Sequence, residues 1–186
     1  MKLSTHDVTK MGISIALAVA AGYALLHVPN FELITSITFL SGLLLGVVRG
    51  VFVGAVSMFF FSLFHPLGVP LIPVLIAQIL FMALSGFAGG IWRKWIRTHA
   101  FHYLYIAGFA LTGFLLTLLY DVGTNVAFAL SSGLMSQVLK IIAAGLVFSL
   151  LHLGTNTILF ATLVPTAVKV MKVDKTQTHI DSRMTI

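Results

Sequence analysis

The sequence predicts an all-α integral membrane protein with six transmembrane helices and both termini in the cytoplasm. Hydrophobic residues make up 59% of the 186 residues and charged residues only 9%, whereas a soluble domain carries about 25% charged residues. The chain therefore has too few charges to cover itself with a solvated surface. Its apolar runs reach the ~20 residues that a membrane helix needs, and they lack the period-two alternation of strands.

Six apolar stretches follow one another along the chain. The expected spans cover residues about 11–28, 33–48, 50–64, 71–91, 103–129 and 141–168. They form one membrane domain over residues 1–168, followed by a polar cytoplasmic tail at 169–186. The first span contains Ala16-x-Ala18, which resembles a signal-peptidase site, but its apolar run continues past that point, so we expect a helix that is retained.

The breaks between the spans follow from proline, glycine and basic residues. Pro29 disfavours helix in the residue before it, and residues 65–70 contain two prolines and a glycine. One helix over the second and third spans would exceed the thickness of the bilayer, so we expect a turn at residues 48–50. A basic turn is expected at residues 92–97, after the fourth span.

The distribution of Lys and Arg indicates the orientation. Of the 11 Lys and Arg residues, only Lys140 falls on the side opposite the termini. The others are Lys2, Lys10, Arg49, Arg93, Lys94, Arg97, Lys169, Lys172, Lys175 and Arg183. Cytoplasmic loops carry the excess of basic residues, so the termini are assigned to the cytoplasm. This topology also explains the net charge of +6 without a nucleic-acid partner.

Two short polar patterns interrupt the apolar stretch from Leu115 to Phe160. Asp121 and Asn125 are four residues apart, and so are His152 and Asn156, so each pair lies on one face of its helix. In hydrocarbon an ionisable side chain is costly and normally faces the bundle interior with a partner. At ~1.5 Å per residue, Asp121 lies roughly 13 Å and His152 roughly 16 Å from the outer ends of their spans, so both reach a similar depth.

These side chains predict a small-molecule pocket in the outer half of the membrane. The candidate substrate-binding residues are Asp121, Asn125, His152, Gln78, Tyr120, Asn156, Phe31 and Glu32. Tyr120 and neighbouring rings suit a flat, heteroaromatic ligand, while Phe31 and Glu32 occupy an outer loop beside the mouth. The carboxylates of Asp121 and Glu32 favour a neutral or cationic polar ligand, although Lys140 acts against that preference.

No enzyme motif accompanies the pocket residues. The sequence contains no H-E-x-x-H, G-x-S-x-G or Walker motif and no paired-carboxylate motif. We expect no metal and no cofactor, and the absence of Cys excludes disulfides and thiolate sites. Three functions stay open at this point: a solute-binding transporter subunit, an intramembrane enzyme using Asp121 and His152 as acid and base, and a scaffold in which that pair only locks helix packing.

Several motifs together resemble the substrate-binding S components of energy-coupling factor (ECF) vitamin transporters. The resemblance covers about residues 10–170. Its motifs are a ridge of small residues (Gly12, Ala16, Ala20 and Ala24), Pro-Asn-Phe-Glu-Leu-Ile-Thr at 29–35, the Gly-rich turn after the second span, Tyr-Asp-Val-Gly-Thr-Asn at 120–125 and His-Leu-Gly-Thr-Asn at 152–156. Small residues at every fourth position let another helix approach closely.

The resemblance implies a small vitamin-binding subunit of a prokaryotic cell (inner) membrane, without ATPase activity of its own. It implies docking through the small-residue ridge onto a transmembrane coupling (T) protein driven by two ABC ATPases, with transport by toppling within the lipid bilayer. Spans four to six and the outer loops correspond to the vitamin site. The sharper fingerprints of the biotin, thiamin or riboflavin members are absent, so the ligand stays open, with cobalamin, a pyridoxine-like compound or another vitamin precursor as candidates.

Overall fold

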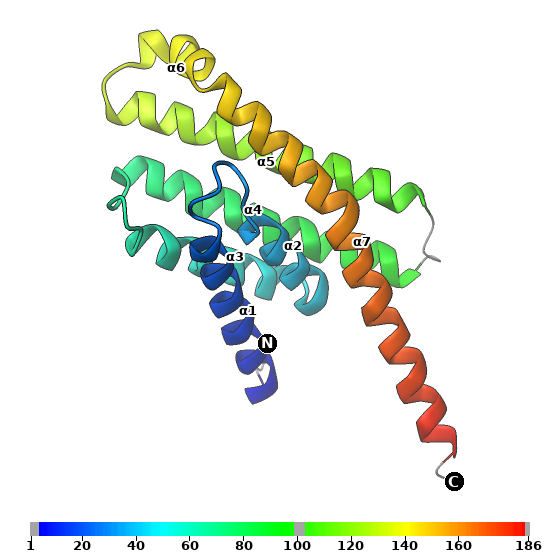
Figure 1. Ribbon diagram of the computed structural model, residues 1–186. Coiled ribbons are helices and arrows are strands. Elements are labelled where there is room, and N and C mark those ends of the chain that lie inside the picture. Colours follow the sequence, from blue (N-terminus) through cyan, green and yellow to red (C-terminus); the bar gives the residue numbers. More distant parts are fainter. Residues whose placement is uncertain (1–3, 99–102, 185–186) are drawn as a thin grey trace.

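The computed structural model describes residues 4–98 and 103–184, and side chains are described for 4–96 and 103–170. In that part of the chain every regular element is a helix, which confirms the predicted all-α fold. The helices are α1 (Thr5–Ala24), α2 (Ile34–Leu45), α3 (Val47–Leu63), α4 (Ile72–Thr98), α5 (Leu104–Ser131), the 3-10 helix η1 (Met135–Gln137), α6 (Val138–Ala144) and α7 (Leu146–Met184) (Figure 1). Lys2 lies outside the described residues, as do the side chains of Arg97, Lys172, Lys175 and Arg183.

Three of the described helices contain segments that are long and apolar enough to cross a membrane. These segments are Ile72–Ile96, Leu104–Ser131 and Leu146–Val170. Three shorter apolar helices accompany them, at Ile34–Leu45, Val47–Leu63 and Met135–Ala144. The helices thus suit a multi-pass membrane protein, and the count of six spans stays a prediction.

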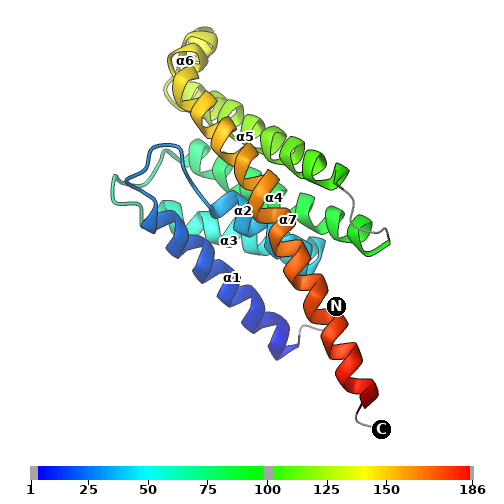
Figure 2. The same cartoon turned by 45° about the vertical axis from the view of Figure 1, so that its right-hand side comes forward.

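The helices form two groups that meet along α4. On one side, α1 packs against α2 and α3, and both α2 and α3 pack against α4. On the other side, α4 packs against α5, and α5 packs against α7, which also reaches α2. Figures 1 and 2 show α5 and α7 side by side, with α7 continuing past the bundle towards the C-terminus. The residues predicted as a polar tail therefore continue α7 as far as Met184.

Three phenylalanines hold α5 and α7 against α2. Phe39 of α2, Phe109 of α5 and Phe160 of α7 are fully buried. The ring centroid of Phe39 lies 6.0 Å from that of Phe109 and 5.0 Å from that of Phe160, both in edge-on arrangements. Such aromatic contacts have a preferred geometry and add to area burial. They fix the positions of α5 and α7, which carry the polar patterns predicted to form the pocket.

Glycine allows α2 and α3 to approach α4 closely. A Cβ atom at Gly42 would lie 1.9 Å from the carbonyl oxygen of Gly86, so no side chain fits between these backbones. The same close approach lets the Ser85 hydroxyl of α4 donate to the Thr35 carbonyl of α2, at 2.9 Å. The first turn of α2 is therefore held against the middle of the bundle.

The break between the second and third spans lies at Gly46 rather than at residues 48–50. Gly46 has φ of 93°, in the left-handed region that glycine enters without strain. A second glycine, Gly145, separates α6 from α7 within the single span expected at 141–168. In both places the chain bends at a residue without a side chain.

The basic residues 92–97, expected to form a turn, are helical. The Trp92 ring lies against Phe109 of α5, with centroids 4.6 Å apart. Its Nε1 donates to the Thr112 hydroxyl at 3.0 Å. These contacts bury one face of the last turns of α4, so the helix continues to Thr98 despite its charges.

The first helix begins at Thr5, six residues before the expected start of the first span. Ser4 and Asp7 form a capping box in which each side chain accepts from the other's backbone N–H. This arrangement satisfies two of the free N–H groups at a helix start. The local capping signal therefore extends α1 beyond its apolar run.

Candidate functional site

A carboxylate and an imidazole meet between α5 and α7. Asp121 Oδ1 lies 2.8 Å from His152 Nδ1, and each side chain is only 12% exposed. An ionised carboxylate can only accept a hydrogen bond, so Nδ1 carries the proton that joins them. The two helical polar patterns thus converge as their estimated depths suggested.

Glu32 brings the α1–α2 loop into the same network. Its Oε1 lies 3.6 Å from His152 Nε2 and accepts from Asn156 Nδ2 at 3.3 Å. Its Oε2 accepts from the Thr35 backbone N–H at 3.1 Å, and the Thr35 hydroxyl donates to Oε1. The carboxylate therefore caps the N-terminal end of α2, where the helix dipole favours negative charge.

A second contact fastens the same loop to α7. The Thr155 hydroxyl donates to the Asn30 carbonyl oxygen at 2.7 Å. Asn30 has φ of 57°, a left-handed conformation that Asn tolerates better than most residues. Two neighbouring loop residues, Asn30 and Glu32, are thus both held by the polar face of α7.

Three buried polar atoms of this network have no hydrogen-bond partner. They are Asp121 Oδ2, His152 Nε2 and Asn156 Oδ1, and the Asn156 residue is fully buried. A buried polar atom without a partner costs about 1–3 kcal/mol. Each of these three atoms could still form a hydrogen bond with a bound molecule.

A cavity of about 80 Å³ lies beside the network. Its lining residues are Glu32, Ile34, Met58, Phe61, Met82, Tyr120 and His152. The Tyr120 ring meets the His152 ring edge-on, with centroids 6.1 Å apart. Apolar and aromatic walls with a few polar groups at one end are typical of small-molecule sites.

Residues 2–172 match a protein family described as the ECF-type riboflavin transporter, S component. The chain belongs to this family. No curated protein and no solved structure matches it. The resemblance deduced from the sequence motifs is therefore confirmed, and with it a substrate-binding subunit of a membrane vitamin transporter. The family description names riboflavin, although the sequence motifs showed no riboflavin fingerprint. S components bind substrate and are not enzymes.

The structure brings together only some of the residues that the sequence predicted as the substrate site of this S component. Four of them, Asp121, His152, Asn156 and Glu32, share the polar network. Tyr120 lines the cavity.

The other three lie outside the network. Asn125 donates from Nδ2 to the Asp121 carbonyl oxygen of its own helix, at 2.8 Å. Gln78 accepts from the Ser62 hydroxyl through Oε1 at 2.9 Å, and Phe31 is not among the residues that line the cavity.

The predicted substrate-binding set left out Thr35 and Thr155, which anchor the loop of this S component. Thr35 follows Glu32 by three residues, the spacing of a helix-capping pair, and Thr155 follows His152 by three residues on the same helical face. Both signals were present in the sequence. The apolar lining residues Met58, Phe61 and Met82 carried no such signal, because apolar residues occur throughout the spans.

The small-residue ridge lies on the outward side of α1. Gly12, Ala16, Ala20 and Ala24 are all exposed, and a Cβ atom at Gly12 would meet nothing within 4 Å. The opposite side of α1, with Met11, Ala18 and Gly22, is buried against the bundle. The ridge is therefore accessible to another helix.

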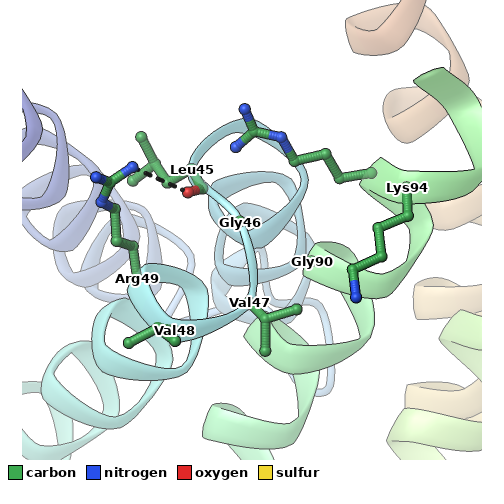
Figure 3. A pocket seen from close by; sticks show the side chains of 8 residues that line it. Leu45, Gly46, Val47, Val48, Arg49, Gly90 and Lys94 are labelled. Atoms are coloured by element: carbon green, nitrogen blue, oxygen red, sulfur yellow. Dashed lines mark hydrogen bonds between the residues drawn. The ribbon is translucent and has the colours of Figure 1, made fainter. Parts of the chain in front are cut away.

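A second hollow, of about 380 Å³, surrounds the α2–α3 break and is lined in part by Arg49, Arg93 and Lys94 (Figure 3). Arg49 pairs with Asp7 at 2.7 Å and donates to the Leu45 carbonyl, while Arg93 donates to the Leu44 carbonyl. The hydrogen bond with the Ser4 hydroxyl, aided by Arg49, holds the pKa of Asp7 below its ordinary value. The two guanidinium groups thus complement the negative C-terminal end of α2.

Proposed function

We propose that this S component captures a vitamin or vitamin precursor outside the cell and delivers it through a coupling protein driven by two ABC ATPases. The observation that carries the proposal is the buried network of Glu32, His152 and Asp121. Glu32 and His152 form the polar end of a cavity with apolar and aromatic walls, and Asp121 pairs with His152. In a chain of a vitamin-transporter family, this is the arrangement expected of the ligand site.

Riboflavin is the first ligand to test, because the family description names it. Its flat ring system suits a cavity flanked by Phe61 and Tyr120. The cavity volume of about 80 Å³ is well below the ~300–1,000 Å³ of common ligand pockets. The site must therefore widen when the ligand enters.

The α1–α2 loop is the part that we propose to move on ligand entry. The loop crosses from α1 to α2 between residues 25 and 33, and Glu32 supplies part of the cavity wall. Only a few polar contacts, from Thr155 to Asn30 and from α7 to Glu32, join it to α7. Exchanging these contacts for contacts with ligand would open the cavity at modest cost.

The proposed topology has six spans, formed by α1, α2, α3, α4, α5 and α6–α7, in a prokaryotic cell membrane with both termini cytoplasmic. The biased distribution of Lys and Arg supports it. Six spans require a turn between α2 and α3, and the chain breaks at Gly46 between these two short helices. Residues 1–168 then form the membrane domain.

The proposed docking surface for the coupling protein is the ridge of Gly12, Ala16, Ala20 and Ala24. Its support is that the four residues are exposed on one side of α1, while the buried side holds the helix in the bundle. Close approach of helices in membranes depends on such small side chains. The ridge and the ligand cavity are lined by different residues.

Ligand identification on the purified protein tests the proposed function. Mass spectrometry of co-purified small molecules, followed by titration of vitamins against the ligand-free protein, should identify one ligand. At a hundredfold excess over Kd it should stabilise the fold by about 2.7 kcal/mol. If no vitamin or precursor co-purifies and none raises the melting temperature, the proposed function is wrong.

A further inference from the structure

Three basic side chains from two helices line the hollow at the α2–α3 break. Arg49 belongs to the first turn of α3, and Arg93 and Lys94 belong to the last turns of α4. Figure 3 shows Arg49 and Lys94 on either side of the chain at Gly46 and Val47. Among the lining residues that the structure describes there is no Asp or Glu. The hollow, of about 380 Å³, therefore presents positive charge to a molecule that enters it.

The helix ends at the hollow do not neutralise this charge. α2 ends and α3 begins at Gly46, so the negative end of one helix dipole meets the positive end of the other. Asp7 pairs with Arg49, and one negative charge against the three positive ones of the lining leaves a formal charge of +2. Arg49 Nε is buried and has no hydrogen-bond partner. An anion in the hollow would offset the remaining positive charge.

The guanidinium group of Arg93 is held at the break by backbone contacts. A Cβ atom on Gly46 would lie 3.5 Å from Arg93 Nη1, so the side chain reaches across from α4 to the end of α2. There it donates to the Leu44 carbonyl oxygen at 2.7 Å. The group is thus positioned beside the hollow, and a planar guanidinium suits the oxygens of a phosphate group.

Apolar side chains on the outside of the same helices border the basic ones. Leu44, Val48 and Trp95 are 50%, 64% and 59% exposed. In a membrane protein Trp is enriched at the level of the lipid headgroups, so Trp95 indicates that the hollow lies near that level. A small soluble anion would contact only the charges. A phospholipid would contact the charges with its phosphate and the apolar side chains with its acyl chains.

We propose that the hollow at the α2–α3 break binds the phosphate group of an anionic phospholipid. Arg93 and Lys94 bind the phosphate, and Arg49 adds positive charge from α3. The acyl chains lie against the exposed apolar side chains of α2, α3 and α4. Basic pockets between membrane helices bind anionic headgroups in this way. The site is separate from the vitamin cavity, since the two are lined by different residues.

Two lipids that differ only in headgroup test the proposal. The full-length protein in detergent is titrated with phosphatidylglycerol or with phosphatidylcholine of the same acyl chains, and native mass spectrometry measures the bound lipid. We expect phosphatidylglycerol to bind at least fivefold more tightly. Equal binding of the two lipids would overturn the proposal, and vitamin binding by the same protein would be unaffected by that result.

The headgroup without acyl chains distinguishes a lipid site from a site for a free phosphate compound. Glycerophosphoglycerol, which carries the headgroup of phosphatidylglycerol, should bind at least tenfold more weakly than the lipid, because it lacks the apolar contacts. If it binds as tightly as phosphatidylglycerol, the hollow takes a soluble phosphate ester and the assignment to lipid is wrong.

Variants connect the lipid to the basic side chains. Arg93→Gln and Lys94→Gln should each weaken phosphatidylglycerol binding roughly fivefold, the contribution of one basic residue at an anionic lipid surface. Arg93→Lys keeps the charge and should retain most of the affinity. Lys10→Gln is the matched control, because Lys10 is an exposed residue of α1 outside the hollow. Unchanged affinity in both folded Gln variants would overturn the assignment, and the comparison of the two lipids decides the proposal if a variant fails to fold.

Co-purification with the coupling protein separates the lipid from an acidic protein partner. Lys94→Gln should leave co-purification unchanged, because the proposed docking surface is the ridge of α1. Loss of co-purification in this variant, together with equal binding of the two lipids, would assign the hollow to protein docking and overturn the proposal.

Discussion

Two carboxylates share one imidazole at the centre of the candidate site. Asp121 Oδ1 lies 2.8 Å from His152 Nδ1, and Glu32 Oε1 lies 3.6 Å from His152 Nε2. The imidazole therefore separates two groups of like charge in a largely buried setting. Removing the imidazole and removing one carboxylate should have opposite consequences for the folded protein.

The first prediction compares His152→Ala with Asp121→Asn in the ligand-free protein. His152→Ala leaves Asp121 and Glu32 without their shared partner, and breaking a buried pair in this way costs about 3–5 kcal/mol. Asp121→Asn removes a buried charge, and His152 can then become neutral, so stability should change little or rise. Thermal unfolding in detergent checks this, with Asn125→Ala as the control because Asn125 bonds within its own helix. Equal melting temperatures for His152→Ala and the wild type would contradict the pairing.

Part of the site could be predicted from residue spacing alone. Asp121 and His152 lie in apolar spans, where an ionisable group needs a partner, and the helical rise placed them at similar depth. Glu32 joins Asp121 and His152 in the polar network only because the α1–α2 loop folds over α7. Contacts over more than 120 residues, such as Asn156 to Glu32, leave no pattern in the spacing of one helix.

Helix packing in the first group depends on glycines that face other backbones. Gly42 lies against Gly86, and Gly54 lies against the Met82 carbonyl, where an added Cβ would come within 2.2 Å. The sequence could predict that these regularly spaced glycines mediate close packing. It could not decide which of them bends the chain, because Gly42, Gly46 and Gly50 recur at the same spacing.

The second prediction concerns this glycine packing. Gly42→Ala places a methyl group 1.9 Å from a backbone oxygen, so α2 and α4 must separate, and overpacking of this kind costs about 1–3 kcal/mol. Gly12→Ala is the matched control, since nothing lies within 4 Å of the new Cβ and Ala favours helix by about 1 kcal/mol. Thermal unfolding should show a lower melting temperature for Gly42→Ala and an equal or higher one for Gly12→Ala. The same melting temperature for both variants would mean that the helices do not approach as described.

The third prediction concerns the exposed ridge of α1. Ala16→Leu and Ala20→Leu should fill the ridge and prevent close approach of another helix. Ligand binding by the isolated protein should be normal, while co-purification with the coupling protein and uptake in cells should fail. Ala107→Leu, the same change at an exposed position of α5, is the control. Uptake that survives both ridge substitutions together would show that the ridge has another role.

At the scale of the whole molecule, composition predicted the fold class but not the residues at which the helices begin and end. The low charge content and the apolar runs predicted an all-α membrane protein, and the helical structure agrees. Helix ends differ where side-chain contacts override composition, as at Trp92, whose packing on α5 continues α4. Capping by Ser4 and Asp7 likewise extends α1 beyond the apolar residues.

The fourth prediction is the topology. Single cysteines are informative because the chain has none of its own. His6→Cys and Val48→Cys should be protected from a membrane-impermeant thiol reagent in intact cells, and Ser132→Cys should be labelled. All three positions are exposed on the protein, so differences report the side of the membrane. Labelling of position 48 from outside would exclude the six-span arrangement.

The affinity of the co-purified ligand for Glu32→Gln tests the central claim most directly. Glu32 joins the loop, α2 and α7 at the wall of the cavity, and Gln keeps its size while removing its charge. If the network binds the ligand, affinity should fall roughly tenfold to a hundredfold, the range for losing a hydrogen bond to a charged group. Asp7→Asn should bind like the wild type. An unchanged Kd for a folded Glu32→Gln protein, measured by calorimetric titration, would contradict the assignment of this network as the vitamin site.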